Sequence, residues 1–255
     1  MKALVIGHKG SIGARHARNL KSLGVEVIGC DLGDTPTHLV DFAVISSPTS
    51  THLFWIRWCE MHSLPFFCEK PVCGSSHDLG HLEQIELSVP NMVACNLRYS
   101  PSMDVIRQFC LQNKVISFHA RVSDSNPARA KYREGLALQD IHEFDYLSHL
   151  FGDILEMDIL ENDNRDSYES FIRFKSGLWG TVHGDRVCDI YHRGLTLTSK
   201  SRTLYIPIDV SPVMYVSEME DFVNRLRAGD QMPNTVKQAL SLTRMICEEY
   251  EFAHA

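Results

Sequence analysis

The stretch Gly7-His8-Lys9-Gly10-Ser11-Ile12-Gly13 decides the fold of this chain. It joins the apolar run 3–6 to the amphipathic stretch 12–23, which gives the order strand, glycine turn, helix. Glycines let the backbone approach a pyrophosphate closely, and a helix N-terminus offers N–H donors and the positive end of its dipole. The spacing Gly-x-x-Gly-x-x-Gly is one residue longer than the usual Gly-x-Gly-x-x-Gly. Taken alone, the stretch fits an ordinary tight turn as well as a nucleotide cradle.

The first hundred residues continue this rhythm of short apolar runs and helical periodicity. The predicted strands are 26–30, 42–46, 66–68 and 92–96, and the predicted helices are 51–61 and 76–87. Such alternation predicts a parallel sheet with helices on both faces, a Rossmann-like domain over residues 1–100.

The connection between Asp31 and Asp41 is too short for a complete Rossmann half. A complete half places a helix, a third strand and another helix there, whereas about ten extended residues reach roughly 33 Å without them. Strand three lies at the sheet edge in the order 3-2-1-4-5-6, so its loss leaves a 2-1-4-5-6 sheet. We therefore expect the fold to persist with part of the adenine pocket removed.

The second part of the chain changes character after Pro101. Its predicted strands are 115–122, 154–160, 168–174, 178–185, 195–198 and 203–206, and its predicted helices are 103–110, 137–150, 216–228 and 235–252. This pattern predicts an α+β domain with a mainly antiparallel open sheet over residues 101–255.

Composition narrows the functional classes. The chain has 255 residues and a formal net charge of -7, which argues against a nucleic-acid partner. No stretch approaches the roughly 20 apolar residues that cross a bilayer, and the N-terminus reads as a buried strand and not as a signal peptide. The eight cysteines are scattered without a Cys-x-x-Cys pair, which predicts reduced thiols and a cytoplasmic location.

Asp31 ends the second predicted strand. An acidic residue there can accept hydrogen bonds from the ribose hydroxyls of NAD and repels the 2′-phosphate of NADP, so NAD is expected over NADP. The alternative interpretation of Asp31 is a turn residue beside Gly33.

Six motifs give the chain a more specific resemblance. They are Gly10-Ser11-Ile12-Gly13-Ala14-Arg15-His16-Ala17-Arg18-Asn19-Leu20, Val44-Ile45-Ser46-Ser47-Pro48-Thr49-Ser50-Thr51-His52, Cys68-Glu69-Lys70-Pro71, Asn96-Leu97-Arg98-Tyr99-Ser100-Pro101, Asp140-Ile141-His142-Glu143-Phe144-Asp145-Tyr146 and Met214-Tyr215-Val216-Ser217-Glu218-Met219-Glu220-Asp221-Phe222. In this order and over nearly the whole chain, they resemble motifs of the glucose-fructose oxidoreductase / inositol dehydrogenase (Gfo/Idh/MocA) family. The resemblance implies an NAD(P)-dependent oxidoreductase that acts on a secondary hydroxyl or keto carbon of a sugar, sugar nucleotide or cyclitol. It also implies a homodimer or homotetramer formed through the second sheet.

The resemblance and the chemistry together give a set of expected site residues. The expected cofactor-binding residues are Gly7, Gly10, Ser11, Ile12, Gly13, Asp31, Ser47, Pro48, His52, Glu69 and Lys70. The expected substrate-binding residues are Arg98, Tyr99, Tyr132, Arg133 and His142, and the expected catalytic residues are Lys70, His142 and Asp145. Because Tyr132 and Arg133 belong to a charged run, they fit a merely solvated loop as well.

Lys70 and His142 carry the expected proton chemistry. Oxidation of a secondary alcohol needs a base for the hydroxyl proton while hydride leaves for the nicotinamide. Lys70 follows a buried strand at the sheet edge where such folds bind ligands, although it also fits a surface lysine paired with Glu69. His142 and Asp145 lie three residues apart and so share one helix face. They fit an acid/base histidine oriented by its carboxylate, and they also fit a helix-face pair without chemistry.

The second domain departs from the family pattern before His142. The acidic residue that the family places three or four positions earlier is replaced by Leu138 and Gln139, and the preceding glycine run is reduced to Gly135. This departure and the shortened Rossmann half support the alternative function, a cofactor-binding sensor or regulatory protein with little or no turnover, whereas the retained Lys70 and His142 count against it. His77 and His81 have ligand-like spacing but no third ligand nearby, so no metal is expected.

Overall fold

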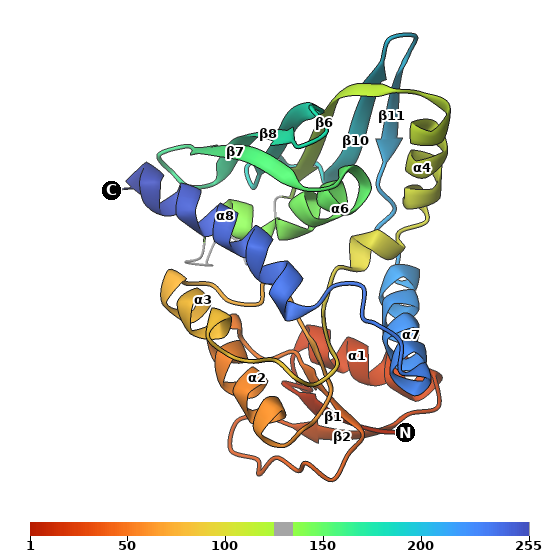
Figure 1. Cartoon of the computed structure of the whole chain (residues 1–255), viewed down its shortest axis with the longest axis vertical. Helices are drawn as coiled ribbons and strands as arrows, with labels where there is room; N and C mark the ends of the chain where they lie inside the picture. The colour runs from red at the N-terminus through yellow and green to blue at the C-terminus, as the bar shows by residue number, and fades with distance from the viewer. Residues whose placement is uncertain (125–134, 255) are drawn as a thin grey trace. The chain divides into compact units, whose positions relative to one another are not determined.

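The chain forms two compact units in a computed structural model that describes residues 1–124 and 135–254 (Figure 1). Unit 1 contains Met1–Asn96 with Pro212–Thr243, and unit 2 contains Leu97–Ser211 with Arg244–Ala255. The predicted domains, 1–100 and 101–255, differ from these units mainly because Pro212–Thr243 returns to unit 1. Helix α7 (Val213–Ala228) accounts for the difference, since it packs on unit 1.

Unit 1 is built on a five-stranded parallel sheet of order β2-β1-β3-β4-β5, which confirms the predicted sheet without its third strand. Its strands are β1 (Lys2–Ile6), β2 (Glu26–Cys30), β3 (Phe42–Ile45), β4 (Phe66–Cys68) and β5 (Asn91–Val93). Its helices are α1 (Ser11–Ser22), the 3-10 turn η1 (Thr49–Thr51), α2 (His52–Met61), α3 (Ser76–Glu83) and α7, and the first part of α8 (Val236–His254) belongs to it.

Helices cover both faces of this sheet because its central strands are apolar on both sides. Ile56 of α2 and Leu79 of α3 pack with Leu4 and Ile45 on one face. On the other face the Phe222 ring of α7 packs edge-on against Phe42, with ring centroids 5.4 Å apart. The parallel strands therefore direct all their carboxyl ends to one edge, where ligands of such sheets bind.

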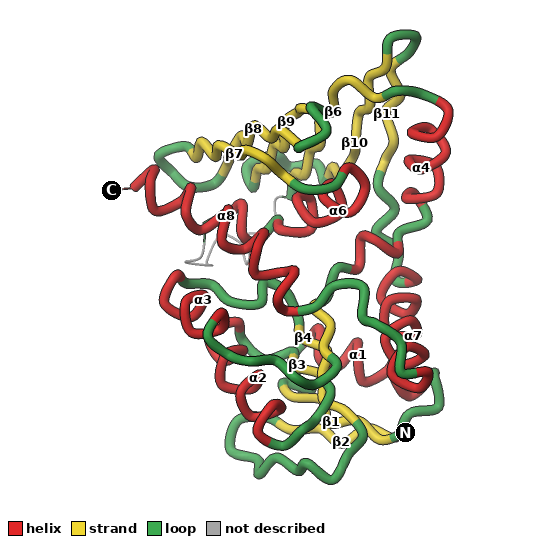
Figure 2. The backbone as a smooth tube through the Cα atoms, in the orientation of Figure 1, coloured by secondary structure: helices red, strands yellow, loops and turns green. Residues whose placement is uncertain are grey.

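The connection after β2 takes the short form that its length predicts. Residues 31–41, all of them described, form no helix or strand and appear as a loop in Figure 2. β2 is consequently an edge strand, and the Leu32 and Leu39 side chains of this connection are exposed.

Unit 2 contains a six-stranded sheet of order β11-β10-β6-β9-β8-β7. Its strands are β6 (Val115–Ser123), β7 (Ile154–Glu161), β8 (Ser167–Phe174), β9 (Trp179–Asp185), β10 (His192–Ser199) and β11 (Thr203–Pro207). All neighbouring strands are antiparallel except β6 and β9, which are parallel. The mainly antiparallel open sheet is thus confirmed.

Helices of unit 2 cover one face of this sheet. They are α4 (Ser102–Gln112), α5 (Leu136–Gln139) and α6 (Ile141–Phe151), and the 3-10 turn η2 (Asn96–Tyr99) precedes them. Phe151 of α6 stacks on Phe118 of β6, and Phe144 stacks on Tyr168 of β8. The predicted helix 137–150 is divided at Asp140, whose backbone leaves the helical geometry (φ -89, ψ 19).

Within the described part of the chain, none of the helices combines the length and the apolar character needed to span a membrane.

Candidate active site

The glycine loop of unit 1 packs so closely that two of its glycines cannot carry a side chain. A Cβ on Gly7 lies 2.7 Å from the carbonyl oxygen of Ser46 at the end of β3, and Gly7 has a φ of +80. A Cβ on Gly13 lies 2.1 Å from the Gly7 carbonyl oxygen. Gly7 thus seats the loop on the sheet edge, and Gly13 seats the first turn of α1 on the loop, as in dinucleotide-binding folds.

The N-terminus of α1 suits a bound anion. The Ala14 N–H donates to the Gly10 carbonyl over 2.8 Å, so the N–H groups of Ser11, Ile12 and Gly13 precede the helical ladder. Among the described residues no side chain caps this helix, and its first turn carries no acidic residue. The residues therefore fit the pyrophosphate of a dinucleotide, which Gly10, Ser11, Ile12 and Gly13 would hold.

Asp31 directs its carboxylate toward the glycine loop. The Lys9 backbone N–H lies 3.4 Å from Asp31 Oδ1, and His8 Nδ1 contacts Oδ2. The turn after β2 uses only backbone atoms of Asp31. Its N–H donates to Asp34 Oδ2 over 2.9 Å, and its carbonyl accepts the Asp34 N–H over 3.0 Å. Because the carboxylate is not needed for that turn, this geometry favours the ribose role over the turn-residue interpretation.

Lys70 emerges at the same edge of the sheet as the glycine loop. It follows β4 and Glu69, whose backbone N–H donates to Ile45 at the end of β3 over 2.8 Å. Glu69 is bound by other groups as well: its Oε1 lies 2.7 Å from Nε2 of the buried His16, and its Oε2 accepts the Lys70 backbone N–H over 3.2 Å. Glu69 is therefore a fixed part of the sheet edge.

The pKa of Glu69 lies below its ordinary value despite burial. Burial by itself raises the pKa, but the hydrogen bond and charge of His16, together with the charge and backbone N–H of Lys70, outweigh it. Glu69 consequently stays ionised at neutral pH and keeps a negative charge beside Lys70.

His52 links two segments of the expected cofactor site. Its Nδ1 lies 3.0 Å from the Pro71 carbonyl and its Nε2 lies 2.9 Å from the Ser47 carbonyl, and the side chain is buried. Burial lowers the pKa of His52 more than the carbonyls and Glu69 raise it. Because both ring nitrogens face backbone carbonyls, the geometry favours a positioning role in which His52 fixes the Ser47-Pro48 turn against the segment after Lys70.

The expected substrate residues of unit 2 include a bidentate ion pair. Arg98 of η2 donates from Nε to Asp145 Oδ2 over 2.8 Å and from Nη2 to Oδ1 over 2.6 Å. Both side chains are largely buried. Asp145 thus anchors Arg98 on α6, and its expected role toward His142, three residues earlier on the same helix, stays a prediction.

Two further ion pairs, which no sequence motif indicates, lie buried beneath the second sheet. Asp140 Oδ1 accepts from Arg186 Nη2 over 2.5 Å, and Arg193 Nε lies 2.8 Å from Glu143 Oε1. A signal for Arg193 was present, since it precedes Leu195 and Leu197 at alternate, inward positions of β10, but the predicted strand began only at Leu195.

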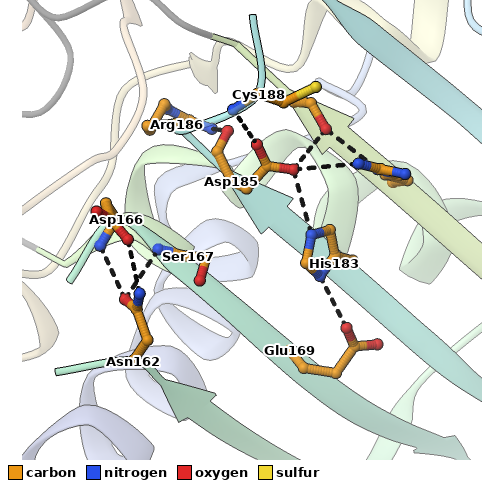
Figure 3. A network of polar contacts seen from close by, with 10 residues as sticks. Asn162, Asp166, Ser167, Glu169, His183, Asp185, Arg186 and Cys188 are labelled. Carbon is orange, nitrogen blue, oxygen red and sulfur yellow. Dashed lines mark hydrogen bonds and ion pairs between the residues drawn. The ribbon is translucent and has the colours of Figure 1, made fainter. Parts of the chain in front are cut away.

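The other face of the second sheet carries a polar network (Figure 3). His183 lies between two carboxylates, with Nδ1 at 2.9 Å from Glu169 Oε2 and Nε2 at 3.2 Å from Asp185 Oδ2. Burial raises the pKa of Asp185, but hydrogen bonds from Ser123, the Cys188 N–H and His183 lower it by more than burial raises it. The pKa of Asp185 therefore lies below its ordinary value. This network holds charged side chains in fixed positions on an open sheet face.

The remaining expected residues are distributed as follows. Tyr99 lies in η2 beside Arg98, and His142 lies half-buried in the first turn of α6. Tyr132 and Arg133 lie outside the described residues, so their expected contact with substrate stays a prediction.

Comparison with solved structures shows whole-chain similarity. A probable dehydrogenase from Thermotoga maritima superposes with a TM-score of 0.84 at 17% identity, covering 100% of this chain and 97% of that one. Myo-inositol 2-dehydrogenase from Lactobacillus plantarum gives a TM-score of 0.82 at 17% identity, with 100% and 97% covered. Scyllo-inositol dehydrogenase from Lactobacillus casei, solved with NAD(H) and scyllo-inositol, gives 0.81 at 18% identity, with 99% and 96% covered.

Comparison by sequence found no match, either with a protein-family model or with a curated protein. The likeness is therefore one of fold. The chain has the fold of inositol dehydrogenases and related oxidoreductases.

Proposed function

We propose that this chain, whose fold is that of the Gfo/Idh/MocA oxidoreductases its motifs resemble, is an NAD-dependent dehydrogenase or reductase. It transfers a hydride between nicotinamide and a secondary hydroxyl or keto carbon of a cyclitol, sugar or sugar nucleotide. The single observation that carries the proposal is the placement of Lys70 and the uncapped, glycine-bounded N-terminus of α1 at one edge of the parallel sheet.

The nicotinamide, when bound, accepts or donates the hydride. Lys70 hydrogen-bonds the substrate oxygen and stabilises the negative charge that develops there as the hydroxyl loses its proton. His142 takes that proton in oxidation and returns it in reduction. Glu69, held by His16, keeps a fixed negative charge beside Lys70.

The substrate class is proposed from the structural neighbours. Two of the three structures compared above are named as inositol dehydrogenases, and one of these is solved with scyllo-inositol. Arg98 of this chain, fixed by Asp145, and Tyr99 beside it are proposed to contact substrate hydroxyls.

A panel assay tests this function. The purified chain is mixed with NAD⁺ and each of myo-inositol, scyllo-inositol, aldoses and nucleoside-diphosphate sugars, and the absorbance of NADH is followed. We expect NADH to form with at least one member. A chain that binds NADH yet oxidises or reduces no member of the panel contradicts the proposal and agrees with a sensor instead.

The open face of the second sheet is proposed to pair with a second copy of the chain. Phe171, Trp179 and Tyr205 expose 42%, 49% and 49% of their surface there, and the first two rings stack on each other. Arg121 and Glu169 flank His183 at facing positions of the adjoining strands, so the face carries both signs of charge. Aromatic rings with complementary charges suit a two-fold interface, in which each copy offers the same surface.

Trp179→Glu is expected to convert this dimer, or a tetramer built from it, toward the 29.0 kDa monomer in sedimentation velocity. The substitution places a carboxylate in an apolar contact and should raise the dissociation constant by about a hundredfold. Leu111→Glu, on an exposed position of α4, is the control and should leave the assembly unchanged. A wild-type chain that sediments as a monomer contradicts the proposed pairing.

A further inference from the structure

Three carboxylates near the start of α6 are each bound by an arginine from another segment of unit 2. The pairs are Asp140 with Arg186, Glu143 with Arg193, and Asp145 with Arg98. The three carboxylate side chains are 2%, 1% and 8% exposed, so all three pairs are buried at their acidic end. Arg186 directly follows β9, and Arg193 belongs to β10. The first turn of α6 is therefore tied to two strands of the second sheet.

His142 lies in the middle of this anchored segment and differs from its neighbours in exposure. Every residue of the range 140–147 is buried except His142, which is half-buried. Asp140 and Glu143 are three residues apart and share one side of the helix start, whereas residues two apart do not, so His142 lies off the side that the arginines hold. The imidazole is thus the part of this segment that can meet a ligand, and its backbone neighbours are fixed.

Asp140 binds Arg186 instead of capping its own helix. It is the N-cap residue of α6, a position at which an aspartate usually accepts an N–H of the first turn. Its side chain forms no such cap, and its Oδ1 accepts from Arg186 Nη2 over 2.5 Å. Arg186 is itself held, since its Nη1 donates to the Asp185 carbonyl over 3.0 Å and its backbone N–H donates to the Asp166 carbonyl over 2.8 Å. The carboxylate therefore fixes the start of α6 to the end of β9.

Stability alone does not account for the two ion pairs of Asp140 and Glu143. Taking two charges out of water is costly, and apolar side chains of similar volume are often as stabilising as a buried ion pair. A buried pair does supply a defined geometry, because the planar fork of an arginine and a carboxylate meet over a narrow range of distances and angles. The arrangement therefore suits the positioning of the turn that carries His142.

We propose that Arg186 and Arg193 are positioning residues for His142. Through Asp140 and Glu143 they fix the first turn of α6, and so they hold the imidazole in the direction in which it exchanges its proton with the substrate oxygen. A misplacement of about 1 Å lowers the rate of such a step by about a hundredfold, so the two pairs act on kcat and not on substrate binding. This inference rests on the proposed function, in which His142 carries the proton.

The double variant Asp140→Leu with Arg186→Met tests the proposal, because it replaces both buried charges of one pair by apolar side chains. Its free energy of unfolding should stay close to that of the wild type. Its kcat should fall by about a hundredfold, while KM for the substrate and the dissociation constant of NADH change less than about threefold. Asp153→Leu with Lys175→Met makes the corresponding replacement at an exposed ion pair of unit 2 and, as the control, should leave all four quantities unchanged.

The same double variant in a His142→Gln background shows whether the effect passes through His142. In that background it should lower the residual kcat by less than about twofold, because the direction of the imidazole no longer matters. A loss of equal size in both backgrounds would show that the pair acts on some other group and would refute the inference.

The outcomes separate this inference from the proposed function. If a folded double variant keeps kcat within about threefold of wild type, the positioning role is refuted while the proposed function stands. If the wild type binds NADH but turns over no member of the panel, the proposed function fails, and the inference fails with it. Circular dichroism checks folding, and Glu143→Leu with Arg193→Met carries the same expectation where the first double variant does not fold.

Discussion

Lys70→Met is expected to lower kcat of the proposed alcohol oxidation by about a thousandfold, within the range found for a lost proton-transfer or oxyanion-stabilising group. Methionine has nearly the length of lysine without its ammonium, so packing at the end of β4 changes little. The substrate oxygen then loses the cation that stabilises its negative charge in the transition state. Because the pyrophosphate is proposed to be held by the glycine loop and not by Lys70, the dissociation constant of NADH should change less than about threefold.

The control for Lys70→Met is Lys21→Met, the same substitution at an exposed position of α1 in the same unit. It should leave both kcat and NADH binding unchanged. Activity of the Lys70 variant within about threefold of wild type would remove Lys70 from the chemistry. A lost NADH affinity with kcat preserved at saturating cofactor would instead make Lys70 a cofactor-positioning residue.

Asp140→Ala is expected to reduce the free energy of unfolding of unit 2 by about 3–5 kcal/mol, the usual effect of removing one partner of a buried ion pair. Asp140 and Arg186 are each only 2% exposed at their side chains, so the variant leaves a guanidinium buried without its carboxylate. Urea denaturation followed by circular dichroism measures the change.

Two comparisons sharpen the test of this ion pair. Glu156→Ala removes one partner of the exposed pair with Arg173 and should change the free energy of unfolding by less than about 1 kcal/mol. The double variant Asp140→Leu with Arg186→Met removes both buried charges and should recover most of the loss. Equal effects of Asp140→Ala and Glu156→Ala would contradict the structural role assigned to the buried pair.

The sheets could be predicted from the sequence because their strands are encoded locally. The apolar run 3–6 and the glycines after it define the first strand and helix, and the alternation over 167–185 defines two antiparallel strands with the Lys175-Ser176-Gly177 turn between them. Even the missing third strand could be predicted, because the chain length between Asp31 and Asp41 admits no alternative.

Contacts between distant segments could not be predicted in this way. Helix α7 has an apolar face, but periodicity does not say which sheet covers Phe222, so its return to unit 1 was not expected. The break at Asp140 was missed because helical periodicity continues through it, while the buried Arg186 that binds its carboxylate is 46 residues away in sequence.

The candidate site shows the same division. Motif spacing predicts Gly7, Gly13 and Lys70 at one sheet edge, and the structure places them there. Motif spacing does not predict that the His8 ring lies over Gly29 and contacts Asp31, nor that Arg98 binds both oxygens of Asp145. Each of these contacts depends on side-chain directions in the folded chain.

Hydride transfer itself is tested most directly with a labelled substrate. The chain is incubated with NAD⁺ and a substrate from the panel that carries deuterium on its ring carbons, and the NADH formed is analysed by proton NMR. The account predicts deuterium at C4 of the nicotinamide, on one face only, in the wild type and almost none in Lys70→Met. NADH without deuterium, or no NADH with any member of the panel although the dinucleotide binds, would contradict hydride transfer by this chain.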